Sequence, residues 1–168
     1  ASNITDDIYD DTSITNNVFL YNIIDDKAER ITNAYSEVES NDNPKENANG
    51  NSRSPSISDE GEFLTYLSEA SNLIKETNVN WQVYLYKKTE TEIENRTVLV
   101  SFNKNGQPST TTSSYNHSSS PRISGDGNTI VFSDYTDNSD TGKQYVYRNT
   151  SGTTWTKIGE FTGAHGSA

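Results

Sequence analysis

The sequence predicts an all-β fold that is built from repeated units of four antiparallel strands. Ser, Thr and Asn together supply 62 of the 168 residues, a composition typical of short strands joined by many turns. Short sequence elements recur in the same order with a period of about 65 residues. No segment longer than about ten residues carries the apolar stripe of an amphipathic helix. These three observations together favour a repetitive antiparallel architecture.

The first two strands of the unit, A and B, are predicted from an internal match without gaps. Residues 54–66 align with residues 120–132, and both begin Ser-Pro-x-Ile-Ser. In each copy a short strand A ends at a turn, Asp-Glu-Gly in the first copy and Gly-Asp-Gly in the second. Glycine there supplies the positive φ that a tight hairpin needs. Strand B follows as a β-branched and aromatic run without proline, at 63–66 and 129–132.

The third and fourth strands, C and D, are predicted from motifs that occur three times each. Strand C is expected at 18–21, 83–86 and 144–147. The first two copies read Val-Phe-Leu-Tyr and Val-Tyr-Leu-Tyr, apolar on both alternating faces. That pattern fits a strand that is buried on both sides between stacked sheets. A polar turn then leads to strand D, which is expected at 28–32, 96–101 and 155–159.

One further repeated element lies between strands B and C. Ala-Ser-Asn followed by Ile or Leu occurs at 1–4 and again at 70–73. The surrounding residues 68–75 are the best helix candidate in the chain, with room for two turns.

The repeat divides the chain, residues 1–168, into one segment of two and a half units. Residues 1–32 supply a B–C loop, strand C and strand D, whereas 54–101 and 120–159 each supply a whole unit. Residues 33–53 and 102–119 are long polar loops. A four-stranded sheet that repeats has to bury both of its faces against neighbours, which a solenoid or a radial propeller achieves.

These motifs resemble the TolB-like β-propeller repeats of bacteria, distant relatives of WD-repeat blades. The resemblance rests on S-x-x-P-x-I-S-x-D-G-x-x-I/V-x-F-x-S, then A-S-N-L, then V-Y-L-Y and L-V-S. Two departures are Glu60 in place of the expected Asp, and the absence of A-S-N-L after Asp134. The resemblance implies four-stranded antiparallel blades of a β-propeller, incomplete in this chain. Because closed propellers carry 4 to 8 blades, we expect the chain either to be part of a larger propeller or to be completed by other copies or another chain.

Charge and missing motifs exclude several classes of function. The net charge of −11 disfavours a nucleic-acid partner, and no apolar run is long enough for a membrane span. Cys is absent, which excludes disulfides and thiolate sites. Met is absent too, so the sequence has no start residue, and we expect it to be a processed or excised piece of a longer chain. The sequence contains no G-x-S-x-G, H-E-x-x-H or Walker motif. The two histidines, His117 and His165, therefore lie in no recognisable catalytic motif. We therefore expect no enzymatic activity and no catalytic residue.

Acidic residues are concentrated in the first part of the chain. Residues 1–100 hold 19 Asp and Glu against 8 Lys and Arg, and residues 101–168 hold 5 of each. One interpretation is a solvated surface that resists aggregation. The other is a calcium site, because calcium prefers carboxylate and carbonyl oxygens. The candidate metal ligands are Asp134, Asp137, Asn138 and Asp140.

Two other loops have a similar composition. Residues 6–11 contain four aspartates, and Glu76, Asn78 and Asn80 lie in the equivalent B–C loop of the first whole unit. A solvated turn remains the alternative at each of these places.

The long connections are the predicted ligand-binding surface. In antiparallel blades the D–A and B–C loops emerge on the same rim, and the resemblance implies that this rim binds a protein, a peptide or a carbohydrate. The aromatic candidates are Tyr35, Trp81, Tyr115 and Tyr135. Packing between sheets is the alternative for Trp81, as it is for Trp155.

These observations lead to two functional hypotheses for a non-enzymatic protein outside the cytoplasm, in the periplasm, at the cell surface or secreted. The first is a β-propeller segment that binds a protein or a glycan through its long-loop rim. The second is a self-assembling structural subunit of a cell-surface ring or filament that neighbouring copies complete. The extracytoplasmic location is inferred from the absence of Cys, the polar composition and the resemblance.

Overall fold

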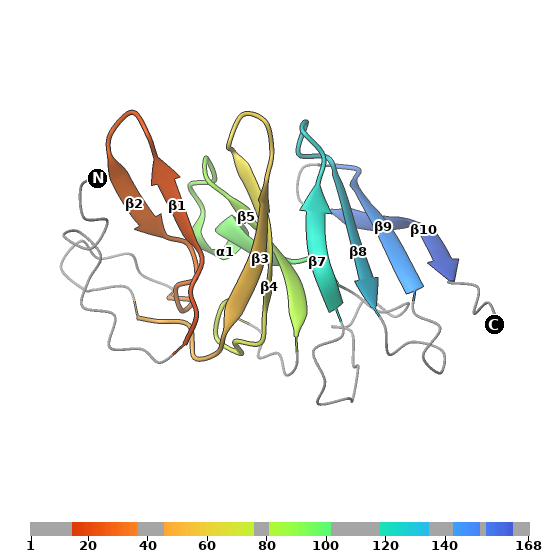
Figure 1. Ribbon diagram of the computed structural model, residues 1–168, viewed down its shortest axis with the longest axis horizontal. Coiled ribbons are helices and arrows are strands. Elements are labelled where there is room, and N and C mark those ends of the chain that lie inside the picture. The colour runs from red at the N-terminus through yellow and green to blue at the C-terminus, as the bar shows by residue number, and fades with distance from the viewer. Residues whose placement is uncertain are drawn as a thin grey trace, which may run out of the picture.

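The chain folds into three antiparallel β-sheets that stand side by side along its longest axis (Figure 1). The structure, a computed structural model, describes residues 15–36, 46–75, 81–101, 118–134, 143–151 and 154–162. The first sheet has two strands, β1 (Phe19–Asn22) and β2 (Lys27–Arg30). Within the described ranges no helix is long and apolar enough to cross a membrane.

The second and third sheets have four strands each, in the order of the sequence. The second contains β3 (Ser52–Ile57), β4 (Phe63–Ser68), β5 (Gln82–Lys87) and β6 (Thr97–Leu99). The third contains β7 (Ser118–Ile123), β8 (Thr129–Asp134), β9 (Lys143–Asn149) and β10 (Trp155–Thr162). The all-β prediction and the antiparallel A–B–C–D order are confirmed, and β1 and β2 occupy the predicted C and D positions.

The helix candidate at 68–75 does not form. Strand β4 continues to Ser68, and residues 69–75 contain no helical turn. Hydrogen bonds compete with helix formation here, because the Ser68 hydroxyl accepts from the backbone N–H of Ala70 at 3.1 Å. The helix that the described residues do contain is the four-residue α1 (Ile93–Arg96), which lies in the polar C–D turn of the second sheet.

The hairpin between strands A and B has the same construction in both four-stranded sheets. In the second sheet the backbone N–H of Ser58 donates to the carbonyl of Phe63 at 2.9 Å, and the Ser58 hydroxyl accepts from the Phe63 N–H at 3.1 Å. Ser124 and Thr129 repeat this pair of bonds at 2.8 and 2.9 Å. The matching glycines, Gly61 and Gly127, both have φ of 71°, a conformation that favours glycine.

Strand A also carries an irregularity at the same place in both sheets. The register shifts between Arg53 and Ser56 in β3, and between Ser119 and Arg122 in β7. Pro55 and Pro121 lie inside these two intervals. Proline has no N–H to donate to the strand ladder, so a bulge is where a paired strand accommodates it.

Strand β5 is buried along its whole length, as the Val-Tyr-Leu-Tyr pattern predicts. Tyr84 and Tyr86 pack in a cluster with Leu20 of β1 and with Val18 and Ile31, which flank β1 and β2. Val83 and Leu85, which alternate with the tyrosines, belong to a second cluster shared with the third sheet. The second sheet is therefore covered on both faces.

The two junctions between sheets follow one rule. We call the face that carries Tyr84 and Tyr86 the front face of a sheet, and the face that carries Val83 and Leu85 its back face. The front face of the second sheet packs on the first sheet. The equivalent front face of the third sheet, with Phe132 and its stacked neighbour Tyr147, packs on the back face of the second. Sheets thus follow one another head to tail.

Hydrogen bonds reinforce the second junction at the A–B hairpins. The backbone N–H of Asp59 donates to the carbonyl of Gly125 at 2.9 Å, which joins the tips of the two hairpins. The N–H of Ile123 donates to the Ser56 hydroxyl at 3.3 Å. The two sheets therefore meet in a defined register as well as through apolar contact.

Candidate functional site

The D–A and B–C connections lie at the end of the sheets opposite to the A–B hairpin tips. This follows from the antiparallel order of the strands, because B–C begins where strand B ends and D–A leads back to the start of strand A. We call this end the loop rim. Its described parts are residues 31–36, 46–51, 69–75 and Trp81, and Figure 1 shows the hairpin tips at the other end.

A network of side-chain amides joins the D–A connection to the B–C connection at the rim. The Asn49 side chain accepts from the backbone N–H of Ser71 and donates to its hydroxyl, both at 2.8 Å. The Asn72 side chain accepts from the N–H of Asn49 at 2.9 Å, and the Asn72 carbonyl accepts from the N–H of Tyr35 at 2.7 Å. The Ala-Ser-Asn-Leu element is therefore structural, since its polar groups bind the neighbouring connection.

The same element is held by close backbone packing. Ala70 and Leu73 are buried in the cluster between the first and second sheets. A Cβ on Gly50 would lie 2.8 Å from the N and Cα of Ala70, so only glycine fits this approach. The Glu69 carboxylate accepts from the Asn51 side-chain amide at 2.6 Å. These contacts hold the described part of the rim of the second sheet in place.

Two of the predicted ligand residues lie within the described part of the rim. Trp81 is half-buried and packs against the cluster between the second and third sheets. Tyr35, also half-buried, belongs to the D–A connection that the amide network holds. Tyr115 and Tyr135 fall outside the described residues, and the roles predicted for them stay predictions.

The structure adds one residue that the sequence did not single out. The guanidinium of Arg53 lies over the Trp81 ring, 4.2 Å from its centroid, within the range of an attractive cation–π contact. Arg53 comes from β3 and Trp81 immediately precedes β5. Nothing in the sequence pairs them, because the contact depends on the strand order. Trp155, in contrast, is buried between the sheets.

The predicted calcium loop is described only at its first residue. Asp134 is the last residue of β8 and pairs in register with Lys143 and Ser118. Asp137, Asn138 and Asp140 lie outside the described residues, as do the acidic residues of 6–11 and Glu76, Asn78 and Asn80. Among the residues that are described, no group of three or more His, Asp and Glu side chains is placed to hold a metal ion. The calcium site stays a prediction.

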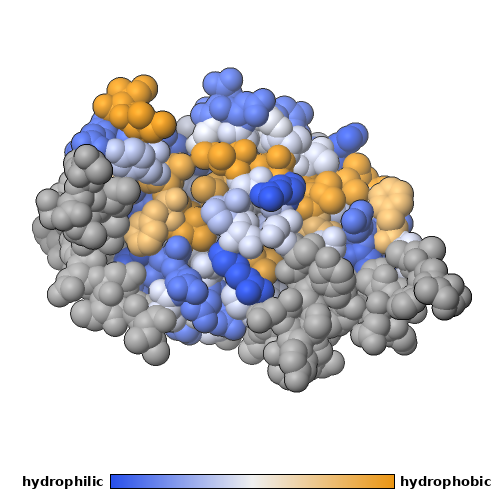
Figure 2. Space-filling view, viewed as in Figure 1, coloured by the Kyte–Doolittle hydropathy of each residue, from blue (hydrophilic) through white to orange (hydrophobic). Residues whose placement is uncertain are grey.

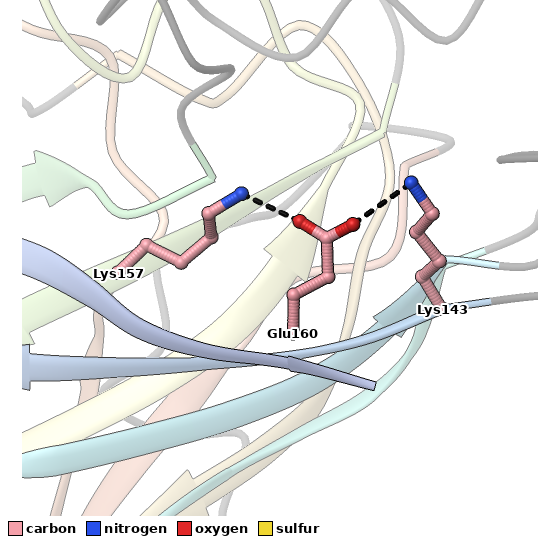
Figure 3. Close-up of polar contacts among 3 residues, drawn as sticks. All are labelled: Lys143, Lys157 and Glu160. Atoms are coloured by element: carbon pink, nitrogen blue, oxygen red, sulfur yellow. Dashed lines mark hydrogen bonds and ion pairs between the residues drawn. The ribbon is translucent and has the colours of Figure 1, made fainter. Parts of the chain in front are cut away.

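A charge cluster lies on the C–D half of the third sheet. The Glu160 carboxylate binds the Lys143 ammonium at 2.8 Å and the Lys157 ammonium at 2.7 Å (Figure 3). The register pairs Glu160 with Tyr145, which places the carboxylate on the front face. Hydrogen bonds from Lys143 and then Lys157 lower the pKa of Glu160 from 4.5 to about 2. The three side chains of the cluster are partly exposed, so the role of the cluster is local stabilisation of β9 and β10.

We predict that Glu160→Gln reduces stability at neutral pH and that this loss fades between about pH 4.5 and pH 2. A carboxylate whose pKa is lowered by folding stabilises the folded state above its unfolded pKa, and that contribution is lost as the pH falls toward 2. Because the pair is solvent-screened, the loss at neutral pH is under about 1 kcal/mol. Urea unfolding from pH 7 to pH 2 checks this. The variant and wild-type curves converge at low pH, and Glu60→Gln, at the exposed hairpin tip, is the matched carboxyl-to-amide control.

Comparison of the chain with protein-family models, curated proteins and solved structures finds no match. Its function is therefore inferred from the repeat and from the geometry of its rim and its sheet faces.

Proposed function

We propose that the chain is a non-enzymatic segment of an extracytoplasmic β-propeller that binds a protein or a glycan through its loop rim. The observation that carries this proposal is the pair formed by Arg53 and Trp81 at the rim of the second sheet. A ring with an adjacent cation offers stacking and hydrogen bonding to a sugar or a peptide.

The amide network supports this choice of contact residues. Asn49, Ser71 and Asn72 are engaged with one another and with the backbone, so they serve to hold the rim rather than to meet a ligand. Arg53, Trp81 and Tyr35 are half-buried and remain partly accessible to a ligand. Contacts that hold the described part of the rim in place also lower the ordering cost of binding.

The test is to screen the whole chain on an array of immobilised oligosaccharides and on a peptide library, and then to compare variants on the best probe. Trp81→Ala and Arg53→Gln are each expected to weaken binding about tenfold or more, as residues at the centre of a binding site do. Glu60→Gln at the opposite end is the matched control and keeps the wild-type affinity. Binding that is lost in the control but kept in both rim variants contradicts the proposal.

Calcium remains a proposed cofactor of the same rim. The proposed ligands Asp134, Asp137, Asn138 and Asp140 belong to the B–C connection of the third sheet, which leaves from the rim end of β8. Carboxylates and an amide in one loop have the oxygen chemistry that calcium prefers.

A second candidate function is a self-assembling structural subunit. It is favoured by apolar side chains that are exposed on the first and last sheets, among them Phe19, Tyr21 and Phe161. Exposed apolar patches on a folded chain mark surfaces that bind other molecules.

A further inference from the structure

The first sheet exposes side chains at the positions that the other sheets bury. By the repeat, Phe19 and Tyr21 of β1 correspond to Tyr84 and Tyr86 of β5. Tyr84 and Tyr86 are 0% and 6% exposed, because the first sheet covers them. Phe19 and Tyr21 are 36% and 43% exposed. The front face of the first sheet therefore has the composition of a junction, but no sheet among the described residues covers it.

The third sheet shows the reverse situation on its back face. Val131 of β8 and Val146 of β9 are register partners there, and by the repeat they correspond to Thr65 and Leu85, both fully buried in the second sheet. Val131 is 37% exposed, and Phe161 of β10, which lies beside Val146, is 61% exposed. The apolar surface at the two ends of the stack is visible in Figure 2, over the β1–β2 turn and near β10.

We infer that these two open faces bind each other in different copies of the chain. In this arrangement the back face of the third sheet of one copy covers the front face of the first sheet of the next copy. The inference develops the self-assembly hypothesis and does not depend on the rim ligand. Its main support is continuity, since the chain already forms this front-to-back junction twice between its own sheets.

The size of the two faces fits this partner. The first sheet contributes strands C and D only, β1 and β2. On the third sheet the exposed Phe161 lies on β10 and the half-buried Val146 lies on β9, which are strands D and C. The C–D half of that back face therefore offers apolar side chains to the C and D strands of the first sheet.

The C–D ends of the two faces carry opposite charges. Arg122 and Arg148 are exposed, and their register positions place them on the back face with Val131 and Val146. The first sheet belongs to the acidic part of the chain and carries Asp25 and Asp26, both exposed, in its C–D turn. Arg148 lies near the end of β9, beside the C–D turn of its own sheet. When the third sheet of one copy stacks on the first sheet of the next in the register of the internal junctions, Arg148 approaches the carboxylates of Asp25 and Asp26. Opposite charges on two matching faces favour their association over like pairing.

The positions equivalent to these two arginines lie in the internal junction. Ser56, the equivalent of Arg122, accepts the hydrogen bond from Ile123 of the third sheet. Lys87, the equivalent of Arg148, is 5% exposed and lies beside Phe63, its register partner on the back face. Both positions already serve as contact positions between sheets.

Analytical ultracentrifugation of the whole chain across a wide concentration range tests the inference without any ligand. We expect species whose masses are whole multiples of 18.7 kDa, because a head-to-tail junction closes a ring or extends a filament. Tyr21→Arg, which places a cation opposite Arg122 and Arg148, and Phe161→Asp are each expected to raise the concentration of half-assembly about tenfold or more. Ile57→Ser changes an exposed apolar residue on the middle sheet and is the control that assembles normally.

Mixing the two interface variants gives the decisive result. Each variant retains one intact face, so an equimolar mixture of Tyr21→Arg and Phe161→Asp is expected to form dimers that grow no further. Thermal unfolding of each variant at low concentration verifies that it folds like the wild type, and Arg148→Glu provides a second back-face variant if Phe161→Asp does not fold. A chain that is monomeric at every concentration, or one whose assembly survives in both interface variants, overturns the inference. Trp81→Ala assembles normally, which separates this outcome from failure of the rim proposal.

Discussion

Gly127→Ala is expected to lower the free energy of unfolding by about 2–5 kcal/mol, the sum of a backbone and a packing cost. Gly127 has φ of 71°, where an alanine is strained. A Cβ there would also lie 2.9 Å from Cε2 and 3.0 Å from Cγ of Phe63 on the neighbouring sheet. That ring packs against the cluster between the two sheets, so it cannot move aside freely. Urea unfolding measures the loss.

Gly61→Ala is the matched control for this prediction. Gly61 occupies the same turn position with the same φ, but the nearest atom to its Cβ would be 3.8 Å away. We expect a loss of about 1–2 kcal/mol from the backbone alone. Equal losses in the two variants would show that the third sheet does not pack on Phe63 as described.

Tyr84→Ala is expected to cost about 3–5 kcal/mol, as truncation of a large buried side chain does. Tyr84 is fully buried between the first and second sheets and stacks on Tyr66 with 5.8 Å between ring centroids. Removing its ring leaves a cavity at the junction that the two sheets cannot close. Thermal and urea unfolding at a concentration where the chain is monomeric give the change.

Phe19→Ala provides the comparison at the same repeat position. Phe19 is 36% exposed because no described sheet covers the front of β1, and we expect a loss of about 1 kcal/mol, near the average for point substitutions. The difference between the two variants measures what a covering sheet contributes. Losses of the same size would contradict the head-to-tail description of the stack.

The sequence predicted the strands well because the repeat constrains them jointly. A single stretch such as residues 83–86 is ambiguous between a strand and a buried helix by apolar content alone. Its recurrence after an A–B hairpin with a positive-φ glycine resolved that ambiguity. The segment 68–75 has no such support from the repeat, and the helix proposed there from local preference does not form. Hydrogen bonds to the Ser68 hydroxyl and to the side-chain amides of Asn49 and Asn72 hold this segment in a non-helical conformation.

The candidate site was harder to predict, for a physical reason. The contact of Arg53 with Trp81 and that of Asn49 with Ser71 join residues 28 and 22 positions apart in the sequence. Only the strand order brings such residues together, and no motif in the sequence links the two members of either pair. The run Asn47-Ala-Asn-Gly-Asn51 was the available signal, since a glycine among amides is typical of a connection packed against backbone.

The uniform junction between sheets has a consequence for how a polypeptide of this kind can change in length. Every junction between sheets joins a front face to a back face. A whole module of 66 residues, the offset between residues 54 and 120, could therefore be duplicated or deleted, and the sheets on either side would still pack on each other. Such a chain has no unique middle module, and a gained or lost module leaves the two outermost faces unchanged.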